Sequence, residues 1–210
     1  DDLIKIGKEY PSTKNWTGFL EIYSNYFKDY KDKPINILEI GVDKGDSLKI
    51  WRKYFTKANI CGIDITNINF KIEGVEILKA DQSNTKSLKE ICDKYKNFDI
   101  IIDDGGHFCK QIIVSLNFLF DYLSNNGLYI VEDLQTSYFP RFGGSRYNLA
   151  KKDTSMNYLK SIADSINYEH FDKPFYRKSK FDGLVKFIHF YQNIAIIKKG
   201  NSVNYFYNSI

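Results

Sequence analysis

Short apolar runs alternate with segments of helical spacing along most of the chain. The helical segments begin near Asp46, Thr85 and Phe108, and in each of them apolar residues recur every three or four positions. The apolar runs between them predict strands at 36–40, 60–65, 75–80, 98–102 and 128–131. Strands that alternate with helices in this way predict a parallel sheet with helices on both faces.

The last third of the chain predicts a different ending for this sheet. A helix is expected over 154–166, and two strands at 184–190 and 194–198 are joined too tightly for a crossover helix. They are therefore expected to be antiparallel. The helix that begins at Phe108 is expected to run to about Leu123 and to stop at Asn125–Gly127.

These elements predict one doubly wound α/β domain over residues 1–210, mostly parallel, with an antiparallel last strand. Residues 1–34 are expected to form a helical lead-in or lid. No Pro/Gly/Ser-rich linker, internal repeat or low-complexity tract divides the chain.

Composition narrows the class of protein. The net charge of +4 is modest for 210 residues and its lysines are scattered, which disfavours a nucleic-acid partner. No stretch approaches the ~20 apolar residues of a membrane span, and the first residues do not resemble a signal peptide. Cys61, Cys92 and Cys109 form no CxxC pair, so a reducing cytoplasm is the expected location.

Polar residues that follow the first three predicted strands indicate a cofactor site. Gly41 and Gly45 mark a tight turn after the first strand, with the spacing Glu39-x-Gly41-x-x-x-Gly45 rather than the GxGxxG of a dinucleotide binder. An acid beside this turn would repel a pyrophosphate but suits the positively charged methionine end of S-adenosylmethionine (SAM). Asp64 ends the second strand, where a carboxylate can accept both hydroxyls of a ribose.

The third strand end adds Asp81 and Gln82, which are placed to hydrogen-bond an adenine edge. Each of these signals has an ordinary alternative, since a short turn needs glycines and Asp64 could cap a helix. Their occurrence on successive strand ends favours SAM. The predicted cofactor-binding residues are Glu39, Gly41, Gly45, Asp64, Asp81, Gln82 and Asp103.

The fourth and fifth strands are followed by Asp103-Asp104-Gly105-Gly106-His107 and by Glu132-Asp133. Carboxylates crowded on neighbouring strands repel one another unless a cation offsets them. We therefore expect a divalent metal with oxygen ligands, Mg²⁺ above all, held by Asp104, Glu132 and Asp133 and binding a substrate hydroxyl. His107 is the expected general base, the alternative being a helix-capping histidine.

The run 98–107 contains Asp-Asp-Gly-Gly-His, and the run 127–138 contains Glu-Asp-Leu-Gln-Thr-Ser-Tyr. Together these two motifs resemble the macrocin and mycinamicin family of sugar O-methyltransferases. The resemblance extends from about Tyr10 to Lys199 and implies metal-dependent methylation of a sugar hydroxyl. It also implies that Tyr138 and the loop 142–144 lie near the acceptor, and that Tyr10–Lys14 corresponds to a lid segment of that family, without its aspartate.

The acceptor implied is a sugar or nucleotide-sugar, a glycan or a glycosylated natural product, and no nucleic acid. Two other functions stay open at this point, an NAD-dependent sugar oxidoreductase or epimerase and a catalytically silent SAM-binding module. The Tyr-x-x-x-Lys spacing of Tyr10 and Lys14 precedes the first strand, which is the wrong place for the oxidoreductase. A homo-oligomer is compatible with the sequence, which does not fix the oligomeric state.

Overall fold

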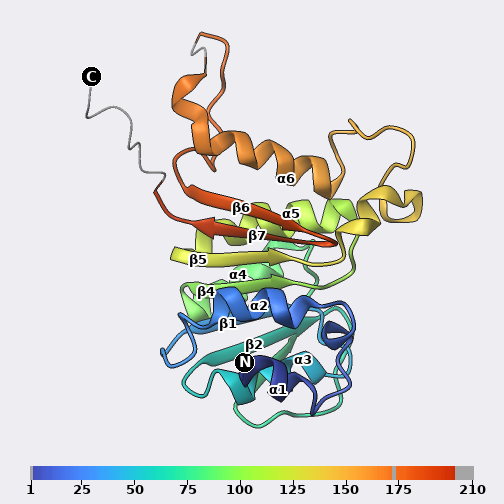
Figure 1. The fold of residues 1–210 in the computed structure, drawn as a ribbon, viewed down its shortest axis with the longest axis vertical. Helices are drawn as coiled ribbons and strands as arrows, with labels where there is room; N and C mark the ends of the chain where they lie inside the picture. The colour runs from blue at the N-terminus through green and yellow to red at the C-terminus, as the bar shows by residue number, and fades with distance from the viewer. Residues whose placement is uncertain (1, 172–173, 202–210) are drawn as a thin grey trace.

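The computed structural model describes residues 2–171 and 174–201, and its strands form one seven-stranded sheet (Figure 1). The strands are β1 (Asn36–Ile40), β2 (Asn59–Asp64), β3 (Val75–Lys79), β4 (Phe98–Asp103), β5 (Leu123–Val131), β6 (Val185–Tyr191) and β7 (Ile194–Lys199). Their order across the sheet is β3-β2-β1-β4-β5-β7-β6. The pairs among β1 to β5 are parallel, whereas β7 is antiparallel to both β5 and β6. The doubly wound class with an antiparallel last strand is thus confirmed.

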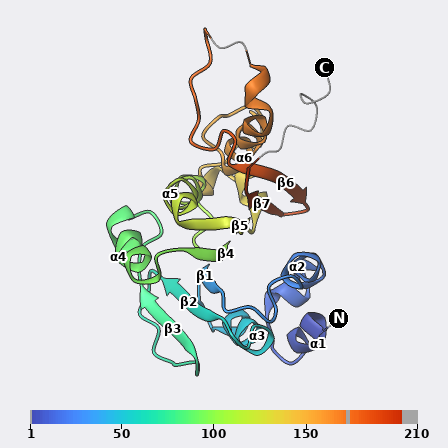
Figure 2. The ribbon, with the colours of Figure 1, turned by 90° about the vertical axis from the view of Figure 1, so that its left-hand side faces the viewer.

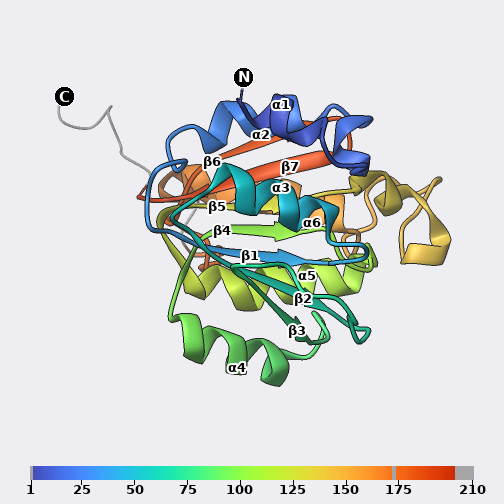
Figure 3. The same cartoon turned by 90° about the horizontal axis from the view of Figure 1, so that it is seen from below.

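Helices cover both faces of the sheet. The α-helices are α1 (Asp2–Gly7), α2 (Phe19–Phe27), α3 (Asp46–Tyr54), α4 (Thr85–Tyr95), α5 (Cys109–Leu119) and α6 (Ser155–Asp164). Figures 2 and 3 show α1, α2 and α3 together on one face and α4 and α5 on the other. Short 3₁₀ helices are η1 (Thr13–Asn15), η2 (Phe120–Tyr122), η3 (Leu134–Tyr138), η4 (Pro140–Phe142) and η5 (Ser165–His170). None of the helices described has the length and apolar character that crossing a membrane requires.

A hydrophobic core lies on each face because alternate side chains of a strand point in opposite directions. Ile37, Ile100 and Ile102 pack with the aromatic residues of α2 and α3, whereas Leu38 and Ile101 pack towards α4 and α5. Both sides of the central strands are therefore dry, which explains why β1 and β4 read as continuous apolar runs.

The strand register brings the polar residues of the first five strands to one edge. Ile40 of β1 lies beside Asp103 of β4, and Asp103 lies beside Val131 of β5. Backbone hydrogen bonds continue past these pairs, from Asp104 N to Ile40 O (3.0 Å) and from Glu132 N to Asp103 O (3.0 Å). The residues directly after three adjacent strands are thus held side by side.

One predicted boundary is wrong. The helix that begins near Phe108 was expected to reach Leu123 and to stop at Asn125–Gly127, but α5 ends at Leu119 and β5 already starts at Leu123. Asn126 has a left-handed φ of 63°, and the pairing of β5 with β4 changes register between Phe98 and Ile100. The Asn-Asn-Gly run therefore lies within an irregular part of the strand and does not end a helix.

Candidate active site

A pocket of about 680 Å³ opens at the edge of the sheet where β1 to β5 end. Its walls come from the residues that follow these strands and from 11–14 and Trp16 of the N-terminal segment. In open α/β sheets this edge is the usual position of a ligand. The chemistry of the pocket therefore depends on which strand-end side chains face it.

The turn after β1 brings backbone against backbone. Gly41 has a φ of 92°, and a Cβ there would lie 2.0 Å from the carbonyl oxygen of Asp104. Gly45 precedes α3 with a φ of 73° and lies against the ring of Phe70. Gly41 lines the pocket and Gly45 does not, but each combines a positive φ with a close contact, so the turn needs glycine at both positions for packing as well as for conformation.

Asp64 and Asp81 line the pocket and accept hydrogen bonds from nearby backbone. Asp64 accepts from the N–H groups of Val42 (2.9 Å) and Thr66 (2.9 Å), and Asp81 accepts from the N–H of Ser83 (2.8 Å). Burial alone would raise the pKa of Asp64, but the backbone N–H groups of Thr66 and Val42 lower it below its ordinary value. Asp64 is therefore a fixed, charged acceptor at the pocket wall.

Gln82 connects the pocket to a buried carboxylate. Its amide nitrogen donates to Asp103 Oδ1 (2.9 Å) and its amide oxygen accepts from the N–H of Gly106 (2.9 Å). The other oxygen of Asp103 accepts from Ser115 (2.5 Å) and Tyr129 (3.2 Å). Asp103 is 1% exposed and does not line the pocket, so its described contacts anchor the turn 104–107 from behind.

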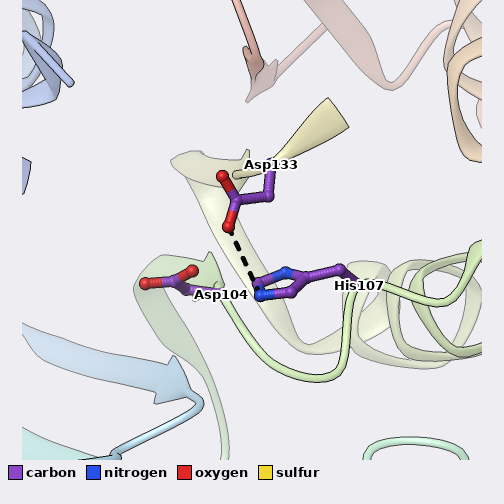
Figure 4. A group of neighbouring side chains, drawn as sticks. All are labelled: Asp104, His107 and Asp133. Carbon is purple, nitrogen blue, oxygen red and sulfur yellow. Dashed lines mark ion pairs between the residues drawn. The ribbon is translucent and has the colours of Figure 1, made fainter. Parts of the chain in front are cut away.

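Asp104, His107 and Asp133 converge at the same edge (Figure 4). Each offers one potential ligand atom, and these atoms lie within 4.8 Å of one another. His107 Nε2 lies 3.3 Å from Asp133 Oδ2. His107 and Asp133 both have left-handed φ values, 58° and 54°, and such residues are uncommon outside functional or tightly constrained turns.

A second group of acids surrounds Lys14. Its ammonium lies 2.5 Å from Asp104 Oδ2, 2.7 Å from Glu132 Oε1 and 3.7 Å from Glu39 Oε1. The hydroxyl of Tyr23 donates to the same oxygen of Glu132. Lys14, Glu39 and Glu132 are at most 2% exposed, so this is a buried ion cluster.

The electrostatics of this cluster follow from one cation among several acids. Burial alone would lower the pKa of Lys14, but the carboxylates of Asp104 and Glu132 raise it above its ordinary value. Burial raises the pKa of Glu39 to about 7. Burial and the charge of Asp104 raise the pKa of Glu132 to about 8 although Lys14 opposes the shift. Lys14 therefore stays charged, and Glu39 and Glu132 are the acids that take up a proton most readily.

The structure divides the residues predicted from the sequence. Those that line the pocket are Gly41, Asp64, Asp81, Gln82, Asp104, His107 and Asp133. Glu39, Gly45, Asp103 and Glu132 do not line it. Among the described residues, the group with metal-ligand geometry is Asp104, His107 and Asp133, whereas the sequence suggested Glu132 in place of His107.

Sequence reasoning missed the partners that hold these acids. They are Lys14, Tyr23, Ser47, Ser115 and Tyr129. The sequence drew attention to Lys14 through the resemblance of its segment to a lid and through its Tyr-x-x-x-Lys spacing from Tyr10, neither of which predicts its acidic partners. The two closest acids are 90 and 118 positions away, a separation at which no spacing motif operates.

The fold and its strand-end pocket place the chain in the structural class of SAM-dependent methyltransferases. The solved structure of MycE methyltransferase from the mycinamycin biosynthetic pathway, in complex with Mg and SAH, matches with a TM-score of 0.91 at 30% identity. The match covers 97% of this chain and 55% of that one. No family model matches the sequence.

Curated proteins point to the same group. Mycinamicin VI 2''-O-methyltransferase of Micromonospora griseorubida is 31% identical over 96% of this chain and 53% of its own length. Demethylmacrocin O-methyltransferase of Streptomyces fradiae is 32% identical over 95% of this chain and 53% of its own length. The resemblance to the macrocin and mycinamicin sugar O-methyltransferases is thus confirmed. The chain spans about half the length of these relatives.

Proposed function

We propose that this chain is the catalytic domain of a SAM-dependent O-methyltransferase that acts, with a divalent metal, on a hydroxyl of a sugar-bearing small molecule. One observation carries the proposal. A pocket lined by Gly41, Asp64 and Gln82 also contains three potential metal ligands, Asp104, His107 and Asp133, which are called the donor group below. A methyl donor and a hydroxyl acceptor bound there would be neighbours.

The pocket wall suits SAM residue by residue. Gly41 lets the ligand approach backbone, Asp64 offers carboxylate oxygens to ribose hydroxyls, and Asp81 and Gln82 face the position proposed for adenine. When bound, SAM supplies a methyl group on a positively charged sulfur. We assign Glu39, Gly45 and Asp103 supporting roles in this site, since they shape the wall without lining it.

The donor group fits a hard divalent cation, because Asp104 and Asp133 offer carboxylate oxygens within 4.8 Å of each other. We propose these two as metal ligands. Glu132, expected as a third, has its Oε1 engaged by Lys14 and Tyr23. A divalent ion held there would lower the pKa of a hydroxyl bound to it. The MycE complexes contain Mg, which supports magnesium here.

His107 is the proposed general base. Methylation turns the acceptor hydroxyl into an ether and releases its proton, and the imidazole of His107 is a group in the pocket that can take it. Asp133, 3.3 Å from Nε2, would fix the ring and stabilise the positive charge that the proton brings. His107 can alternatively be a metal ligand, and a pH–rate profile separates these roles.

The acceptor class is proposed from the relatives, two of which are named as O-methyltransferases of rhamnosyl tetracenomycins. The exposed aromatic side chain of Phe108, which directly follows His107, offers apolar surface to such an acceptor, and Tyr138 is also exposed. A nucleotide-sugar is the other acceptor to screen. We propose residues 1–210 as one domain and leave its assembly open. The three buried free cysteines accord with the predicted cytoplasmic location.

The experiment that tests the proposal is isothermal titration with S-adenosylhomocysteine, in Mg²⁺ and in EDTA, with NAD as the competing ligand. We expect S-adenosylhomocysteine to bind in both conditions and NAD not to bind. An Asp104→Ala variant should lose methyl transfer to glycosylated acceptors. Binding of NAD alone would replace the proposal with an oxidoreductase, and normal turnover by Asp104→Ala would remove the metal from it.

A further inference from the structure

Lys14 is the residue whose contacts the proposed chemistry leaves unexplained. It belongs to the single 3₁₀ turn η1, far from the strands in sequence, yet its ammonium lies within 4 Å of acids that end β1, β4 and β5. It is 1% exposed. A lysine buried this deeply is rare unless it is paired, and here it is paired with acids of three adjacent strands.

The N-terminal segment that carries Lys14 also forms part of the pocket wall. Pro11, Ser12, Thr13 and Trp16 line the same cavity as Asp64 and Asp104. The segment is stiff, because the side-chain amide of Asn15 donates to the carbonyls of Gly7 (2.9 Å), Tyr10 (2.8 Å) and Ser12 (3.2 Å). The residues on either side of Lys14 are thus held together by these hydrogen bonds.

Asp104 belongs to two groups at once. It is a member of the donor group with His107 and Asp133, and its Oδ2 is also 2.5 Å from Lys14. The orientation of this carboxylate is therefore set in part by a residue that does not belong to the donor group. Tyr23 and Lys14 share Glu132 Oε1, which holds the lysine itself in place.

We propose that Lys14 is a positioning residue that fastens the wall formed by 11–16 over the cofactor pocket and orients Asp104. The ammonium supplies the countercharge that crowded strand-end acids need, and it ties a wall of the pocket to those acids. This inference rests on the proposed function for the identity of the ligand, but the attachment of the wall does not depend on it.

The test compares Lys14→Met with wild type in the full chain. We expect the affinity for S-adenosylhomocysteine in EDTA to fall by about tenfold or more, a size within the 5–150-fold range, roughly, that is typical of coupling between two sites. We expect the backbone amides of residues 12–16 to exchange hydrogen faster in the ligand-free protein. Lys14→Arg keeps the cation and should recover most of the affinity.

Lys53→Met is the matched control, because Lys53 pairs with Glu9 and also ties the N-terminal segment to α3, but through an exposed ion pair. It should leave both readouts at the wild-type level. If Lys14→Met does not fold, the pair Lys14→Met with Glu132→Gln removes both charges and should show the same loss against Glu132→Gln alone. Wild-type affinity and exchange rates in a folded Lys14→Met protein would overturn the inference.

A failure of the proposed function gives a different result. In that case wild type does not bind S-adenosylhomocysteine at all, while Lys14→Met still accelerates exchange over 12–16. Loss of affinity in Lys14→Met without faster exchange would refute the attachment of the wall.

Discussion

Replacement of Gly41 by alanine tests the closest backbone approach in the site. Gly41 has a φ of 92° and Gly18, before α2, has a φ of 73°, so an alanine is strained at both. A Cβ at Gly18 would meet no atom closer than Glu21 Oε2 at 3.9 Å, whereas one at Gly41 would lie 2.0 Å from Asp104 O. Gly18→Ala therefore isolates the conformational cost, and the difference between the variants measures the clash.

The two costs can be estimated separately. A left-handed conformation costs an L-residue about 1–2 kcal/mol, and this applies to both variants. Relief of the clash in Gly41→Ala requires the backbone of Asp104 to move by more than 1 Å, roughly, since non-bonded heavy atoms rest about 3.5 Å apart. That movement strains the hydrogen bond from Asp104 N to Ile40 O. Overpacking of this kind costs about 1–3 kcal/mol, so Gly41→Ala should lose about 2–5 kcal/mol in total.

Urea unfolding followed by circular dichroism measures both variants. Gly18→Ala should lower the free energy of unfolding by about 1–2 kcal/mol. Gly41→Ala should lower it by a further 2 kcal/mol, roughly, and should also weaken S-adenosylhomocysteine binding because Asp104 is displaced. Equal stability of the two variants would refute the close approach of β1 and β4 at this turn.

Three further predictions concern neighbouring groups. Ser115→Ala removes a donor from buried Asp103 and should lower the free energy of unfolding by about 1–3 kcal/mol, while exposed Ser161→Ala should change little. The pKa of Asp64 is lowered in the folded state, so its contribution to stability is present above the unfolded pKa and is lost as pH falls through the folded pKa. In unfolding experiments at decreasing pH, the stability difference between wild type and Asp64→Asn should therefore shrink below about pH 4. His107→Gln should bind S-adenosylhomocysteine normally yet lower kcat by about 10²–10⁴ in a methyl-transfer assay, and a smaller loss would remove His107 as the base.

The predictable part of the structure is the part that local periodicity determines. The strands β1 and β4 were located because both of their faces are buried and their sequences are continuously apolar. A parallel sheet then puts strand ends on one edge, so the meeting of Gly41, Asp64 and Asp104 followed from connectivity. The start of β5 could not be predicted because its first half contains Asn and Gly, which usually mark turns.

The wall around the acids was not predictable for a different reason. Lys14 lies beside Asp104 and Glu132 only through the packing of the N-terminal segment against the sheet edge. Such contacts depend on tertiary packing, and the sequence contains no periodic signal for them. A resemblance could indicate that residues 10–14 matter, but not which acids they meet.

The directions in which Asp103, Asp104 and Glu132 point could, in contrast, have been inferred from strand geometry. Consecutive side chains of a strand point to opposite faces, so Asp103 and Asp104 cannot both face the pocket. Asp103 points to the side of α5, where Ser115 donates to it, and Asp104 points to Lys14. Glu132 lies beside Asp104, points in the same direction and contacts the same lysine.

Asp133 departs from this alternation because its φ of 54° turns the chain just after β5. The turn brings its carboxylate to His107 rather than to the face opposite Glu132. Two adjacent acids therefore face different partners, Glu132 the buried ammonium and Asp133 the imidazole of His107, while Asp104 belongs to both groups. Because Lys14 contacts Asp104 as well as Glu132, its position constrains both acids at once.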